Sequence, residues 1–275
     1  MLPAGRVLTL AGRGTTYVRE CGPVGGRPLL LLHGWTANAD LNWAHCYAPL
    51  AAAGFRVVAL DHRGHSRGIR DPRPFRLEDC ADDAAALVGA LGLGSVTAVG
   101  YSMGGPIAQL LWRRHPHLVD RLVLCATAQT FNTSARERAL FALLAGAGAA
   151  ARRLQPQRLA ALAMAAMTGR HVDPASWAWA FEQLARHDWL QVIEAGRCLG
   201  RFDSRGWAPT IDVPTACVVT LEDHVVPPGR QLDLAAAIPG ATVQPVAGDH
   251  AACLVQPDDF VPALLAGVGA HANAA

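Results

Sequence analysis

One serine of the chain stands in a pattern typical of nucleophiles. Gly100-Tyr101-Ser102-Met103-Gly104 has the form G-x-S-x-G, and it lies between an apolar run and an apolar-periodic segment. In that context the motif predicts a sharp strand-to-helix turn that exposes the serine hydroxyl at the carboxyl edge of a sheet. Such a turn strains the serine backbone, and the glycines let strand and helix pass closely. The amino end of the helix favours negative charge there. The chemistry indicated is attack of a hydroxyl on a carbonyl carbon.

A serine hydroxyl is a weak nucleophile until a base takes its proton. Among 11 histidines, we predict His250 as this base, because it follows the last predicted strand and precedes the last helix. An acid must then fix its tautomer and stabilise its cation. We predict Asp223, directly after the preceding strand. Glu222 and Asp249 compete, but Glu222 comes one residue too early, and the side chain of Asp249 should diverge from its neighbour His250.

The tetrahedral intermediate of such an attack needs N–H donors for its oxyanion. The backbone N–H of Met103, directly after the serine, is one candidate. The loop after the apolar run Pro28–His33 supplies the second, and we predict the N–H of Trp35. The substrate is expected to contact Trp35, Tyr101 and Trp177.

The elements that must position these residues alternate between short apolar runs and helix-like segments, which is typical of parallel α/β architecture. Continuous apolar runs predict strands that are covered on both faces. A mostly parallel sheet of about eight strands is therefore expected, opened by a hairpin. The predicted strands are Arg6–Leu10, Thr15–Arg19, Pro28–His33, Phe55–Asp61, Ser95–Tyr101, Arg121–Ala126, Thr215–Leu221 and Ala241–Val246. The predicted helices are Asn42–Ala53, Leu77–Leu91, Met103–His115, Arg230–Ala237 and Ala251–Val268.

The alternation ends near Thr127, and for about 80 residues the sequence looks helical only. This stretch is rich in tryptophan, phenylalanine and methionine. We interpret residues 128–207 as a helical lid inserted into a core domain of residues 1–127 and 208–275. An apolar lid of this kind indicates a substrate with an apolar acyl or aromatic group.

Composition limits the other possibilities. All 24 basic residues are arginine, which excludes a lysine Schiff base, pyridoxal-phosphate attachment and a phosphate-loop lysine. The net charge of +2 gives no reason to expect nucleic acid or an anionic membrane as a partner. Histidines such as His33, His62 and His65 lack metal-ligand spacing, and His33 is interpreted as a structural hydrogen-bonding residue. We expect no metal and no cofactor.

Seven cysteines, an odd number without a C-x-x-C pair, are interpreted as buried free thiols. This predicts a reduced, cytoplasmic setting. The amino-terminal segment lacks the apolar core of a signal peptide, and no apolar run is long enough to span a membrane. A small molecule is the expected partner, with the protein a monomer or homodimer.

Five blocks of the chain, in this order, resemble those of the α/β-hydrolase superfamily of serine esterases: "LLLLHGW", "VVALDHRGHSRG", "AVGYSMGGPIAQLLW", "IDVPTACVVTLEDHVVPP" and "VAGDHAACLVQPDDF". The similarity covers nearly the whole chain outside the lid. It implies the same triad and oxyanion donors, and it implies that Asp61, Arg63 and Gly64 shape the loop after their strand. At the position of Ser102, haloalkane dehalogenases and epoxide hydrolases of this fold carry an aspartate. Dienelactone-type hydrolases carry a cysteine there. The serine therefore argues against all three kinds of enzyme.

The expected function is cleavage of a carboxylic ester of a small to medium apolar substrate through an acyl-enzyme. The same residues could instead serve thioester, lactone or C–C bond hydrolysis, acyl transfer or perhydrolysis. A non-catalytic ligand receptor that has kept the fold is a further alternative.

Overall fold

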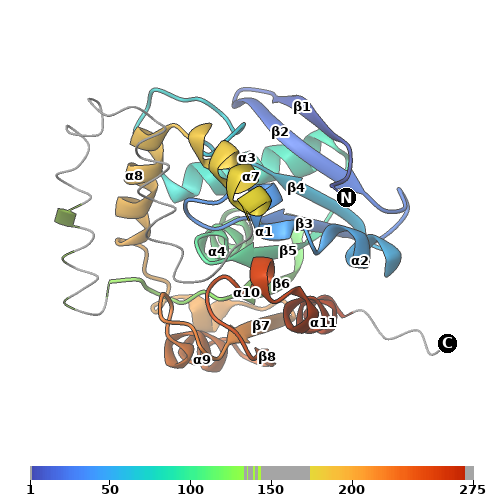
Figure 1. The fold of residues 1–275 in the computed structure, drawn as a ribbon. Coiled ribbons are helices and arrows are strands. Elements are labelled where there is room, and N and C mark those ends of the chain that lie inside the picture. The colour runs from blue at the N-terminus through green and yellow to red at the C-terminus, as the bar shows by residue number, and fades with distance from the viewer. Residues whose placement is uncertain (1, 133–134, 136–138, 140–141, 144–173, 270–275) are drawn as a thin grey trace.

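The computed structural model describes residues 2–132, 135, 139, 142–143 and 174–269. Its centre is an eight-stranded sheet in the order β1-β2-β4-β3-β5-β6-β7-β8 (Figure 1). Strand β2 runs antiparallel to both neighbours, and β4, β3, β5, β6, β7 and β8 are parallel to one another. The predicted sheet is confirmed, including its opening hairpin. The strands are β1 (Gly5–Leu10), β2 (Gly14–Cys21), β3 (Pro28–Leu32), β4 (Arg56–Leu60), β5 (Val96–Tyr101), β6 (Val119–Cys125), β7 (Thr215–Thr220) and β8 (Thr242–Val246).

Helices cover both faces of the sheet (Figure 1). On one face pack α3, α4 and α9, and on the other α1, α2, α10 and α11. The described α-helices are α1 (Ala39–Trp43), α2 (Tyr47–Ala52), α3 (Leu77–Ala90), α4 (Gly104–Arg114), α7 (Pro174–Ala185), α8 (Trp189–Leu199), α9 (Pro228–Ala237), α10 (Ala252–Val255) and α11 (Pro257–Val268).

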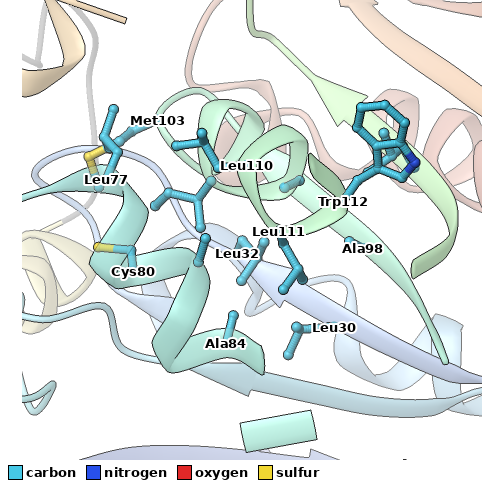
Figure 2. Packing of buried hydrophobic residues seen from close by; sticks show 14 of the residues in the cluster. Leu30, Leu32, Leu77, Cys80, Ala84, Ala98, Met103, Leu110, Leu111 and Trp112 are labelled. Atoms are coloured by element: carbon cyan, nitrogen blue, oxygen red, sulfur yellow. The ribbon is translucent and has the colours of Figure 1, made fainter. Parts of the chain in front are cut away.

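Strand β3 shows why the apolar runs form central strands. Leu30 and Leu32 point to the face covered by α3 and α4, where Figure 2 shows them beside residues of those helices. Leu29 and Leu31 point to the opposite face, and all four side chains are inaccessible to solvent. Burial of each leucine stabilises the fold by roughly 1.5–3 kcal/mol. A strand buried on both faces is therefore apolar at most of its positions.

The order of the strands reverses at β3. The chain crosses from β3 to β4 on one side, and β5 then lies on the other side of β3. In open α/β sheets, ligands bind outside the carboxyl ends of the strands at such a reversal. Trp35 follows β3 and Ser102 follows β5, so the topology brings these two predicted site residues to the same place.

Two predicted helices are each divided in two. The segment 42–53 contains the end of α1 and all of α2, because Pro49 has no N–H to donate to the carbonyl of His45. The segment 251–268 is divided at Gln256, whose backbone (φ −134°, ψ 54°) is not helical. Pro257 follows Gln256, and a proline disfavours the helical conformation of the residue before it.

The predicted lid is described in part. Helices α7 and α8 lie in it. The segment is not helical throughout, since Thr130 and Asp203 pair as an isolated antiparallel bridge. Within the predicted lid, residues 133–134, 136–138, 140–141 and 144–173 lie outside the described residues.

Buried charges hold the loop after β4, as the resemblance implies for Asp61 and Arg63. Asp61 accepts hydrogen bonds from the N–H of Ala39 (3.0 Å) and from Arg67 Nε (2.9 Å), and thereby joins the loops after β3 and β4. The guanidinium of Arg63 makes two 2.8 Å hydrogen bonds to Asp83 on α3, and both side chains are almost fully buried.

This ion pair gives a test of the fold. Asp83 also accepts from Arg13 (2.7 Å), so Asp83→Ala removes a carboxylate shared by two arginines; the buried Arg63 keeps only its hydrogen bond to Asp71, and Arg13 keeps its bond to Asp79. We expect the free energy of unfolding to fall by about 3–5 kcal/mol. Asp203→Ala is the matched control, because it removes an exposed pair with Arg205 and should cost about 1 kcal/mol or less. Urea unfolding measures both, and equal losses would contradict the account.

Candidate active site

Ser102 occupies the turn between β5 and α4 with its backbone in the left-handed region, at φ 51°. This conformation is strained for a residue with a side chain. Three hydrogen bonds hold it: Ser102 N–H donates to the carbonyl of Cys125 (2.9 Å), and Ser102 O accepts from Gly105 N–H (2.9 Å) and the Thr127 hydroxyl (2.8 Å). The neighbouring strand β6 and the loop after it therefore hold the turn in place.

Glycines let the elements around this turn approach more closely than any side chain would allow. A Cβ on Gly100 would overlap the carbonyl of Gly104, and a Cβ on Gly104 would overlap the carbonyl of Leu32 on β3. Gly34, in the loop after β3, faces Ser102 itself, since a Cβ there would lie 3.3 Å from Ser102 Cβ. The glycines of the motif thus have the role that the sequence predicted.

The structure brings the predicted base and acid to Ser102. The Ser102 hydroxyl lies 3.0 Å from Nε2 of His250, and Nδ1 of His250 lies 2.7 Å from Oδ2 of Asp223. With Nδ1–H donating to the carboxylate, Nε2 is free to accept the serine proton. The His250 ring is half-buried and Asp223 is fully buried. The arrangement can take a proton from Ser102 and stabilise the resulting imidazolium.

Of the three acids that the sequence left in competition, Asp223 is the one that lies against His250. Its Oδ1 accepts from the N–H groups of Val225 and Val226, both at 2.8 Å, and its Oδ2 accepts from the Thr220 hydroxyl at 2.8 Å. Burial acts to raise the pKa of Asp223, but the hydrogen bonds from His250, Val226 and Thr220 lower it overall. The carboxylate therefore stays ionised at neutral pH. Glu222 is exposed, and Asp249 caps Ala251 N–H.

Sequence reasoning missed several residues that hold this arrangement. Gln231 donates to Asp223 Oδ2 (3.2 Å) and to the carbonyl of Val226 (2.7 Å). Asn42 accepts from Gly34 N–H at 2.6 Å and so orients the loop after β3. Gln231 lies in α9 and Asn42 lies in α1. Neither residue belongs to a motif, and nothing in the sequence indicates which residues they bond.

The two predicted oxyanion donors lie in the loops that meet at Ser102. Within the described part of the chain, the backbone N–H groups of Trp35 and Met103 make no hydrogen bond. The side chain of Met103 is buried in the core (Figure 2), so only its backbone faces the site. The half-buried indole of Trp35 donates to the carbonyl of Val192 on α8 at 2.7 Å.

The prediction that Tyr101 contacts substrate is corrected by the structure. Its side chain is only 2% exposed and packs edge-on against Trp43 and Phe260, on the sheet face covered by α1 and α11. Its hydroxyl donates to the carbonyl of His250 at 2.8 Å. Alternate residues of a strand point to opposite faces, and position 101 belongs to the core. Tyr101 thus supports His250 from behind. Trp177 lies in α7, and its side chain is outside what the structure describes.

Four further histidines are buried beside the site: His33, His62, His65 and His187. As predicted, His33 is structural, since its Nδ1 contacts the carbonyl of Gly34 (2.8 Å) and its Nε2 accepts from His62 N–H (2.8 Å). Burial lowers the pKa of His62 to about 3 and that of His187 to about 4. Neither His62 ring nitrogen makes a hydrogen bond among the described residues. Within the same residues, no group of three or more ligating side chains could hold a metal ion.

The family model for the alpha/beta hydrolase fold matches residues 27–257, and the chain therefore belongs to this family. It is 35% identical over 121 residues to a non-heme chloroperoxidase from Streptomyces lividans, a match covering 44% of this chain and 43% of that protein. The chain matches less than half the length of these curated relatives.

Two solved structures share the fold over almost their whole length. The enol-lactonase from Burkholderia xenovorans LB400 superposes with a TM-score of 0.81 at 22% identity, covering 95% of this chain and 98% of the other. The esterase EaEST from Exiguobacterium antarcticum superposes with a TM-score of 0.82 at 21% identity, covering 96% and 98%. At these identities the likeness shows the fold alone. No helix among the described residues is both long and apolar enough to cross a membrane.

The turn at Ser102 predicts a strong effect of one methyl group. In Gly104→Ala the new Cβ must displace the carbonyl of Leu32, and we expect the free energy of unfolding to fall by about 3 kcal/mol. Gly89→Ala is the matched control, because Gly89 lies in α3 with open space around it and alanine should stabilise the helix by roughly 0.5–1 kcal/mol. Chemical denaturation of both variants measures this, and an unchanged stability in Gly104→Ala would refute the close packing.

The buried histidines predict sensitivity to acid. His62 is neutral when folded and takes up a proton near pH 6.5 when unfolded, so its contribution is constant above pH 6.5 and destabilises increasingly as the pH falls towards 3. His62→Phe should remove this loss. Between pH 7 and pH 5 the free energy of unfolding of the variant should fall by about 2 kcal/mol less than that of the wild type. Urea unfolding at both pH values measures the difference.

The control for that experiment is His117→Gln, which changes an exposed histidine and should keep the wild-type slope of unfolding free energy against pH. A slope in His62→Phe equal to that of the wild type would show that His62 is already charged, or hydrated, in the folded protein.

Proposed function

We propose that this protein is a serine hydrolase that cleaves a carboxylic ester of a small to medium apolar substrate through an acyl-enzyme. The observation that carries the proposal is the hydrogen-bonded series in which Ser102 Oγ lies 3.0 Å from His250 Nε2, and His250 Nδ1 lies 2.7 Å from Asp223. A hydroxyl, an imidazole and an ionised carboxylate in this order form a nucleophile, a general base and its orienting acid.

In the proposed reaction, Ser102 Oγ bonds to the ester carbonyl carbon while its proton passes to His250 Nε2. The carbonyl oxygen becomes an oxyanion, stabilised by the N–H groups of Trp35 and Met103. Collapse of this intermediate breaks the bond to the alcohol, which leaves with the proton from His250. Water then attacks the acyl carbon, gives its proton to His250, and releases the acid and free Ser102. Asp223 stays ionised throughout.

Cleavage of an ester is a more specific activity than membership of the family implies. Proteins similar to this chain carry the names esterase, lactonase and chloroperoxidase. The same three residues serve lactone, thioester or C–C bond hydrolysis, acyl transfer or perhydrolysis equally well, because each begins with an activated Ser102. The protein could instead be a receptor that binds a ligand without catalysis. A measurement of the reactivity of Ser102 distinguishes the enzyme from the receptor.

The remaining proposals concern the surroundings of the site. We propose that residues 128–207 act as a lid over the core domain of residues 1–127 and 208–275, and that Trp35 and Trp177 contact the apolar substrate. The chemistry requires no metal or cofactor. All seven cysteines are free thiols, five of them buried, which supports the proposed cytoplasmic location. A monomer or homodimer remains the expected state.

Turnover of p-nitrophenyl esters of graded chain length tests the function. The wild type should hydrolyse them, and Ser102→Ala should lose about 10⁶-fold in kcat because the three residues act as a unit. Asp223→Asn should lose about 10⁴-fold, because Nδ1 would no longer face a charged acceptor. The matched control is Ser95→Ala, an exposed serine before β5, which should retain full activity.

Ester hydrolysis that persists in Ser102→Ala would refute the mechanism. A wild type that is inert towards esters but cleaves a thioester, a lactone or a β-diketone would keep Ser102 as nucleophile and replace the substrate class.

A further inference from the structure

His187, in the connection between α7 and α8, links the two loops that surround the site. Its Nδ1 accepts from Ser66 N–H (2.7 Å) in the loop after β4, and its Nε2 contacts the carbonyl of Thr36 (3.2 Å) in the loop after β3. The side chain is 4% exposed. Because burial lowers the pKa of His187 to about 4, the ring is neutral at pH 7. Its Nε2–H therefore donates to Thr36.

Both backbone partners of His187 hold unfavourable conformations. Thr36 has φ 58° and Ser66 has φ 42°, and both lie in the left-handed region. Among the described residues, only Ser102 and Ala126 share this feature without being glycine. Such a conformation costs about 1 kcal/mol or more, and it persists only where surrounding contacts determine it. The imidazole of His187 provides such a contact to Thr36 and to Ser66.

The turn at Thr36 matters because it directly follows Trp35, the proposed oxyanion donor. On the other side of Trp35, Gly34 packs against Ser102 and is held by Asn42. The position of the Trp35 N–H is thus fixed from its amino-terminal side by the core and from its carboxyl-terminal side by Thr36.

Helices α7 and α8 hold the same loop at two further points. The Trp35 indole donates to the carbonyl of Val192 (2.7 Å), and the Asn38 amide donates to Gln183 Oε1 (3.0 Å). A small apolar cluster joins the loop to both helices; it consists of Ala37, Leu41, Leu184, Trp189 and Val192. The contacts converge on residues 35–41, where the proposed oxyanion donor lies.

We propose that His187 is a positioning residue for the proposed oxyanion site: its ring holds the turn at Thr36, with the Trp35 indole as second anchor, and so aims the Trp35 N–H at Ser102. Helices α7 and α8 then contribute to transition-state stabilisation without touching the reacting atoms. This inference rests on the proposed function and adds a role for residues outside the three that move protons.

Two substitutions of His187 separate its two hydrogen bonds. In His187→Asn, the side-chain oxygen can replace Nδ1 and accept from Ser66, but the side chain stops short of Thr36. In His187→Gln, the longer amide can replace Nε2 and donate to Thr36. We expect His187→Asn to lower kcat for a p-nitrophenyl ester at least tenfold with KM within about twofold, because small displacements of a donor are costly. His187→Gln should stay within about threefold of the wild-type kcat.

Glu194→Ala is the matched control. It removes a 3.1 Å hydrogen bond between α8 and the N–H of Phe75, and it leaves both hydrogen bonds of His187 in place. Its kcat should stay within about twofold of the wild type. The proposal is overturned if His187→Asn leaves kcat unchanged, if His187→Gln loses as much as His187→Asn, or if Glu194→Ala loses as much as either.

The rate at which a fluorophosphonate labels Ser102 separates this inference from the proposed function. If the wild type is not labelled, the proposed nucleophile fails and this inference falls with it. If the wild type is labelled and His187→Asn is labelled as fast, this inference alone fails. Thermal unfolding checks each variant first. Should His187→Asn not fold, Trp35→Phe removes the indole bond to Val192 instead, and an unchanged kcat in that variant overturns the proposal.

Discussion

The left-handed backbone of Ser102 is the constraint on which the rest of the site depends. A residue with a side chain holds φ 51° only where neighbouring groups compensate the strain, and here Cys125, Gly105 and Thr127 bond both backbone polar atoms of the serine. These bonds require β5, β6 and α4 to meet within a few ångströms of one another. Glycines at positions 100 and 104 make that approach sterically feasible. The apolar sheet is buried on both faces, and the stability it supplies offsets the energetic cost of the strained turn.

The polar groups around Ser102 are fixed before any substrate binds. Asp223 accepts bonds from two backbone N–H groups, a hydroxyl and an amide, so its charge is retained despite burial. His250 is held by that carboxylate on one side and by the Tyr101 hydroxyl at its carbonyl. Groups that are already oriented need little reorganisation as charge develops, and this is the main source of electrostatic stabilisation in enzymes. The proposed role of His187 extends the same logic to the oxyanion loop.

The sequence predicts the features that depend on local patterns. Apolar runs located the strands to within about two residues at most ends, and G-x-S-x-G located Ser102 at its turn. The offset of Asp223 and His250 from the ends of their strands predicted two residues that the structure places beside each other, with His250 next to Ser102. The features that the sequence did not predict depend on three-dimensional contacts. Tyr101 was expected to contact the substrate, but side chains alternate between the two faces along β5, and its ring points into the core. Thr220, Gln231 and His187 act through partners that no local pattern specifies.

A crystal structure of the protein after reaction with a fluorophosphonate would test the roles of Ser102 and of the two N–H donors together. We expect phosphorus bonded to Ser102 Oγ, with one phosphonyl oxygen about 2.7–3.1 Å from both the Trp35 and the Met103 nitrogen and His250 Nε2 adjacent. Phosphorus on another residue, or a phosphonyl oxygen directed away from both N–H groups, would contradict this expectation.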